Sequence, residues 1–201
     1  GTAASGELLA GLKNLTAVTN ATLTINDQLV ATMANTNTLE EALDVINTSV
    51  SGVEASAFVE ATLGTTSATG NGIITGTDRL TFAILGQDGS TTSIQVGNTA
   101  SLQEIADSLN SQAGDIVQAS VNDDGRLELS SDTAARISTS STGTIADEIG
   151  SSAVTYEASL SFELTNAEPG LVKNATAGGE PTINAVDIAL GTAVTDPSTI
   201  G

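Results

Sequence analysis

Carboxylates are the one kind of ionisable group that this sequence supplies in number, with 24 acidic and 5 basic residues and neither histidine nor cysteine. Without histidine, the commonest general base is missing, and so are Ser–His and Cys–His nucleophile pairs. A serine–lysine pair would have to use Lys13 or Lys173, and no catalytic motif surrounds either lysine. Two carboxylates could still carry out glycoside chemistry, and acidic pairs occur at Glu40-Glu41 and Asp123-Asp124.

Both acidic pairs have a structural explanation. Glu40-Glu41 falls at an expected helix start, where acids favour the helix macrodipole, and Asp123-Asp124 precedes a turn glycine. A calcium site could draw on Asn122, Asp123, Asp124 and Asp132. These acids do not alternate as they do in a calcium loop with a final bidentate Glu, so a hairpin turn is favoured there and at Asp88-Gly89. We expect no enzyme, no cofactor and no metal site.

The charge balance also restricts the partners. The formal net charge is −19, which repels phosphate backbones and anionic membrane surfaces. No apolar run approaches the roughly 20 residues of a membrane span. We therefore expect no nucleic-acid partner and no membrane partner, and we expect the isolated chain to be a monomer because like-charged copies repel one another.

One segment of the sequence occurs twice, as TLEEALDVINTSVSGVEAS from Thr38 and as SLQEIADSLNSQAGDIVQAS from Ser101. Each copy begins with a hydroxyl residue followed three positions later by Glu, which is the capping-box pattern of a helix start. Apolar residues then follow at i, i+3, i+4 and i+7, which predicts an amphipathic helix. The shared structural positions are Thr38, Leu39, Glu41, Ile46, Asn47, Val53 and Ala55 in the first copy and Ser101, Leu102, Glu104, Leu109, Asn110, Val117 and Ala119 in the second.

Within this repeat, Ile46 and Leu109 should be buried against a sheet. Asn47 and Asn110 should end the helices, because Asn tolerates left-handed backbone geometry.

Strand and turn patterns surround the two predicted helices. Residues 21–32 predict two short strands around Asn26-Asp27, and 52–63 predict a strand with alternate buried positions. Residues 64–78 are rich in Gly and Thr and are the best linker candidate. Further expected elements are a hairpin at 79–98, a hairpin at 115–131 turning at Asp124-Gly125, a short helix at 145–150 and a strand region at 153–165.

These patterns together predict an α+β fold that is mostly β. It would be built from repeated strand-strand-helix-strand units, with short amphipathic helices on antiparallel sheets. We assign the first unit to residues 1–66, the second to 67–150, and a strand region with the start of a third unit to 151–201, as either one outer lobe or two small domains. Thr182–Asn184 repeats Thr24–Asn26, so we expect a strand near the start to pair with one near the end.

The repeated unit resembles the hook IN motif of bacterial flagellins and hook-associated proteins. Ile46-Asn47 carries the two residues that name the motif, and Leu109-Asn110 departs from it in the second copy. The segments DDGRLELSS (123–131) and TGTIADEIGSS (142–152) are similar to that family's hairpin and to the end of its unit.

The resemblance implies a structural, non-catalytic outer domain of a flagellin-like filament subunit, exposed to solvent on the extracellular bacterial flagellum. Its partners would be other flagellin subunits, bound through flanking regions. Gly1–Leu9 lack the features of a signal peptide, so we expect a middle piece of a longer chain that is exported without a cleaved signal.

Other functions stay open. The same motif would suit a filament-cap or other hook-associated protein, a surface adhesin that binds carbohydrate, or a phage or surface-layer β-domain. The sequons at Asn14, Asn20, Asn47 and Asn174 are expected by chance in so Thr-rich a chain. Ser138–Thr144 is a candidate for O-glycosylation, as the resemblance implies, although an unmodified loop is the favoured interpretation.

Overall fold

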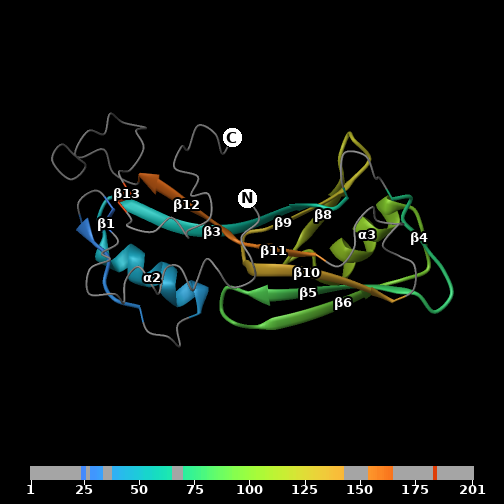
Figure 1. Cartoon of the computed structure of the whole chain (residues 1–201), viewed down its shortest axis with the longest axis horizontal. Coiled ribbons are helices and arrows are strands. Elements are labelled where there is room, and N and C mark those ends of the chain that lie inside the picture. The colour runs from blue at the N-terminus through green and yellow to red at the C-terminus, as the bar shows by residue number, and fades with distance from the viewer. Residues whose placement is uncertain are drawn as a thin grey trace. The chain divides into compact units, whose positions relative to one another are not determined.

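The computed structural model describes residues 24–25, 28–33, 38–64, 70–142, 154–164 and 183–184, which belong to two compact units (Figure 1). Unit 1 comprises Gly1–Ala57 and Ser159–Gly201, and unit 2 comprises Phe58–Ala158. The described elements are short helices and antiparallel strands, so the predicted α+β, mostly β fold class is confirmed. The division into motif units at 66/67 and 150/151 stays a prediction. Neither described helix has the length and apolarity needed to cross a membrane.

A small sheet in unit 1 joins a segment near the start of the sequence to one near its end. Its strands are β1 (Thr24–Ile25), β2 (Gln28–Leu29) and β13 (Ile183–Asn184), in the order β13-β1-β2. Thr24 pairs with Asn184 and Ile25 with Ile183 in antiparallel register. The expected pairing of a strand near the start with its echo near the end is therefore confirmed.

Unit 1 also contains a helix, the first part of a long strand and the strand that pairs with it. Helix α2 (Leu39–Ser49) buries Leu39, Ala42, Leu43 and Ile46, the face that the 3.6-residue period predicts. Strand β3 (Val53–Thr62) follows, with alternate residues buried from Val53 onward, and it pairs with β12 (Ser159–Leu164). Only the first five residues of β3 belong to unit 1.

The prediction that Asn47 ends the first helix is wrong. The helix continues to Ser49, and its C-cap Val50 has extended backbone. The Thr48 hydroxyl donates to the Asp44 carbonyl and the Ser49 hydroxyl to the Val45 carbonyl. The Val50 N–H donates to the Ile46 carbonyl at 3.0 Å, so the helix ends without a left-handed residue and the Asn47 side chain is available for another contact.

Unit 2 contains a four-stranded antiparallel sheet in the order β11-β10-β5-β6. Its strands are β5 (Arg79–Gly86), β6 (Thr91–Val96), β10 (Ala134–Thr142) and β11 (Thr155–Glu157), and Figure 1 shows β5, β6 and β10 side by side. The interpretation of Ser138–Thr144 as a loop is wrong over 138–142, because these residues pair with β5 from Ala83 to Arg79. Ile137 and Thr139 are buried in that pairing.

The second repeat forms the other part of unit 2. Helix α3 (Leu102–Ala113) precedes the hairpin of β8 (Gln118–Val121) and β9 (Leu127–Ser131), and β9 pairs with β3 from Val59 to Thr62. As in the first copy, the prediction that the asparagine ends the helix is wrong, because α3 passes Asn110 and ends at Ala113.

The linker prediction for 64–78 is also wrong in part. Ile73–Ile74 form β4, which pairs with β7 (Thr99–Ala100), the strand that precedes α3 in the sequence. The buried Thr99 hydroxyl donates to the Gly72 carbonyl at 2.7 Å. Gly72 has φ +74°, and a Cβ there would meet the Leu102 backbone nitrogen at 2.1 Å, so glycine is required at this approach.

Both predicted hairpin turns form. The Gly86 N–H donates to the Ser90 carbonyl around the first, and the Asn122 N–H donates to the Arg126 carbonyl around the second. Gly89 and Gly125 supply the positive φ that these turns need. The expected strand region at 153–165 divides into β11 and β12 at Ala158, and the expected helix at 145–150 lies outside the described residues.

Candidate functional site

The residues that the sequence indicates cap the N-termini of both repeated helices. At α2, the Thr38 hydroxyl accepts from the Glu41 N–H at 3.3 Å and the Glu41 carboxylate accepts from the Thr38 N–H at 3.0 Å, which completes a capping box. At α3, the Ser101 hydroxyl accepts from the Glu104 N–H at 3.2 Å. The Glu104 carboxylate accepts from the Ala100 N–H at 2.7 Å, one residue before the N-cap Ser101 that a capping box would use. This bond joins the helix to β7, of which Ala100 is the last residue.

The cap at Ser101 can be tested by substitution. Ser101→Ala is expected to lower the free energy of unfolding by about 1 kcal/mol, whereas Ser101→Gly should lower it by a few tenths, because glycine tolerates the cap backbone and lets water reach the amide. Urea denaturation of both variants measures the difference. A loss in Ser101→Gly as large as the loss in Ser101→Ala would contradict this expectation.

The two asparagines of the repeat make the same unusual contact. The Asn47 amide nitrogen donates to the Ala55 carbonyl at 3.0 Å, and its amide oxygen accepts from the Ala55 N–H at 2.6 Å. Asn110 binds Ala119 in the same way, with both distances 2.8 Å. Each asparagine thus ties the helix to one residue of the strand that follows it. The repeat in the sequence marked Asn47 and Asn110 as equivalent positions, but it did not predict that their side chains bind the following strand.

The other predicted motif positions lie around these asparagine contacts. Leu39, Ile46, Leu102 and Leu109 are buried on their helices, and Val53, Ala55, Val117 and Ala119 are buried on the segments that follow. The structure therefore brings the positions together within each copy, with the first set in unit 1 and the second in unit 2. Their joint role as motif residues stays a prediction.

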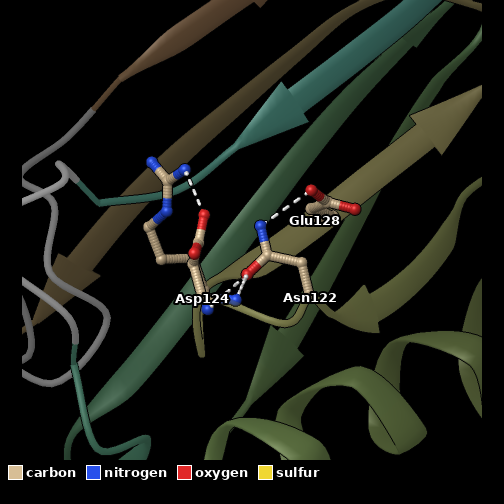
Figure 2. A network of polar contacts seen from close by, with 4 residues as sticks. Asn122, Asp124 and Glu128 are labelled. Atoms are coloured by element: carbon tan, nitrogen blue, oxygen red, sulfur yellow. Dashed lines mark hydrogen bonds and ion pairs between the residues drawn. The ribbon is translucent and has the colours of Figure 1, made fainter.

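A polar network holds the β8–β9 turn (Figure 2). The Asn122 amide oxygen accepts from the backbone N–H groups of Asp124 and Arg126, and its nitrogen donates to the Glu128 carboxylate at 2.8 Å. Arg126 forms an ion pair with Asp124 at 3.6 Å. Asn122 and Asp124, which could have served calcium, thus hold a hairpin turn. Within the described ranges, no three acidic side chains gather as a metal site would need.

Two ionisable groups of unit 2 are perturbed by their surroundings. Hydrogen bonds from the side chain and backbone of Ser90 lower the pKa of the exposed Asp88 carboxyl, in keeping with its place in the β5–β6 turn. Burial raises the pKa of Tyr156, whose hydroxyl donates to the Thr62 carbonyl at 3.2 Å. Each group has a local structural role that accounts for its shift.

Two shallow hollows adjoin the β8–β9 hairpin. One, of about 250 Å³, is lined by Glu60, Ala61, Thr62, Ser120, Glu128, Leu129 and Ser130. The other, of about 360 Å³, is lined by Asn110, Gly114, Gln118, Ala119, Ser120 and Ser130. Their carboxylate, amide and hydroxyl groups could hydrogen-bond to a polar ligand, but neither lining contains an aromatic ring on which a sugar could stack.

Comparison with known families identifies the second repeat. Residues 80–133 match the family model described as the flagellin hook IN motif. This segment is similar to the flagellin hook IN motif. The match runs from β5 through α3 to the end of the β8–β9 hairpin, so the motif contains both the Asn110 contact and the network of Figure 2. No curated protein matches the sequence.

The match covers residues 80–133 only, and it agrees with the resemblance of that segment to the hook IN motif. The matched segment is the copy in which Leu109 replaces the isoleucine of the motif's name. Leu109 is fully buried, as is Ile46 in the first copy. An apolar side chain at this point of the helix is therefore what the packing needs, and either residue supplies it.

Proposed function

We propose that this chain is the solvent-exposed, non-catalytic outer region of a flagellin-like filament subunit, located outside the cell on the bacterial flagellum. The observation that carries the proposal is the hook IN motif at residues 80–133. Flagellins are structural proteins that assemble with one another, and in this proposal the assembling parts are flanking regions of a longer subunit that is exported without a cleaved signal peptide.

The antiparallel pairing of β1 with β13 supports an inserted outer region. Thr24–Ile25 lie beside Ile183–Asn184, so a segment near the start of the sequence pairs with one near its end. Domains inserted into a host commonly have such adjacent ends.

The charge supports the same role. A net charge of −19 makes copies of this region repel one another at short range, which would keep neighbouring filaments dispersed. In this proposal the isolated region is a monomer.

Deletion of residues 1–201 from the full-length subunit tests the proposal. We expect the shortened subunit to polymerise still, because the region contributes no assembly contact in this proposal. The filaments should have a thinner outline in electron micrographs and should keep their length.

A control separates export from assembly. The shortened subunit must be detected outside the cell at the level of the intact subunit. If it is exported and stable but forms no filament, the outer-region proposal fails and a role in assembly or capping is favoured. Normal filaments with lost adhesion to a carbohydrate surface would favour the adhesin alternative, with the two polar hollows as the place to look.

A further inference from the structure

Asn110 satisfies both backbone groups of a residue at the edge of a sheet. β8 is the last strand in the order β12-β3-β9-β8, so β9 lies along one of its edges and the other edge faces away from the sheet. In a β-strand, the N–H and C=O of one residue point to the same edge. Both groups of Ala119 are bound to Asn110, so they point to the edge opposite β9.

The end of helix α3 also binds the residue before β8. Val117 lies immediately before Gln118, the first residue of β8. Its N–H donates to the carbonyl of Ala113, the last residue of α3, at 2.9 Å. Helix α3 thus makes two contacts here, a main-chain carbonyl bond just before β8 and a side-chain amide contact within it.

The same contact occurs in unit 1. Asn47 holds both backbone groups of Ala55 in β3, and Ala55 lies four residues before Val59, which pairs with Ser131 of β9. A primary amide offers a donor and an acceptor side by side, as a peptide group of a neighbouring strand does. Asparagine therefore imitates one residue of a pairing strand at each place.

We propose that Asn110 and Asn47 are strand-edge caps, whose amides occupy the positions where a strand from a second copy of this chain would otherwise pair. A strand edge with free N–H and C=O groups is a template for pairing with another chain. Subunits held close together would meet this hazard continually. The inference rests on the contacts alone and stands whether or not the chain belongs to a filament.

The test is Asn110→Ala in the complete 201-residue chain, with Gln103→Ala as the matched control. Gln103 is an exposed amide on the same helix, and it donates to the Asp107 carboxylate one turn along α3 at 2.9 Å. Sedimentation velocity at increasing micromolar concentration measures association. Salt of about 1 M screens the like charges to a Debye length of about 3 Å.

We expect the wild type and Gln103→Ala to sediment as monomers and Asn110→Ala to approach twice the monomer mass as its concentration rises. Hydrogen exchange at the Ala119 amide supplies a second readout. In Asn110→Ala this amide should exchange faster than in the wild type when dilute, and should become protected again on association, because a strand from the second copy replaces the lost amide.

Asn110→Asp separates edge capping from plain stability. Its carboxylate can accept from the Ala119 N–H but cannot donate to the Ala119 carbonyl, so we expect a folded protein with weaker association than Asn110→Ala. The proposal is overturned if folded Asn110→Ala stays monomeric while the Ala119 amide exchanges faster, or if Gln103→Ala associates equally. Unfolding of both Asn110 variants would also overturn it, because the asparagine would then be a requirement for folding.

Discussion

Phe82→Ala is expected to lower the free energy of unfolding by about 3–5 kcal/mol, the usual range for removal of a buried aromatic ring. Phe82 is 1% exposed and lies in β5, with β6 on one side and β10 on the other. It stands opposite Ile94 and Thr139, which are also buried. Because strands on both sides hold the β5 backbone in place, the sheet cannot collapse into the cavity that Phe82→Ala creates. The free energy of unfolding should therefore fall by nearly the full amount.

Phe58→Ala is the matched control for this experiment. Phe58 is also in unit 2, but it is half-buried, on the face of β3 opposite Val59. Its replacement should cost about 1 kcal/mol, in keeping with partial burial. Urea denaturation followed by circular dichroism measures both variants. A loss at Phe82 no greater than the loss at Phe58 would contradict the burial of Phe82 within the β11-β10-β5-β6 sheet.

Leu109→Ala and Ile46→Ala are each expected to cost about 2–5 kcal/mol. Both side chains are fully buried, one on α3 in unit 2 and one on α2 in unit 1. Each sits one residue before the asparagine that binds the following strand, so a shift of the helix into the cavity would pull on that amide contact. The structure should therefore relax little, and the cost should lie in the upper part of the range.

The controls for these two variants are exposed apolar residues in the same units. Ile73 in unit 2 is 44% exposed and Leu29 in unit 1 is 59% exposed. Ile73→Ala and Leu29→Ala should each cost about 1 kcal/mol or less. Equal losses in buried and exposed variants, measured by the same denaturation, would mean that the repeated helices do not pack through the face that their periodicity indicates.

Features determined over a few residues could be predicted from the sequence. The hydroxyl–Glu pairs at Thr38 and Ser101 mark both helix starts, because a cap joins groups three residues apart. Asp88-Gly89 and Asp124-Gly125 mark both hairpins, because a turn needs one residue with positive φ and glycine supplies it. The buried helix faces and the alternation of β3 follow from periods of 3.6 and 2 residues.

What the tertiary structure decided depends on partners far apart in the sequence. Strand β10 was not predicted, because its residues from Ala134 to Thr142 are mostly Ser, Thr and Ala. They lack the apolar alternation that marks a strand in the sequence. It is a strand because β5 and β11 flank it and bind its backbone on both edges, which needs little from its side chains. The roles of Asn47 and Asn110 were missed for a related reason. A local pattern suggests a helix end, but each amide finds a better partner eight or nine residues away, and only the packing of helix on strand brings the two together.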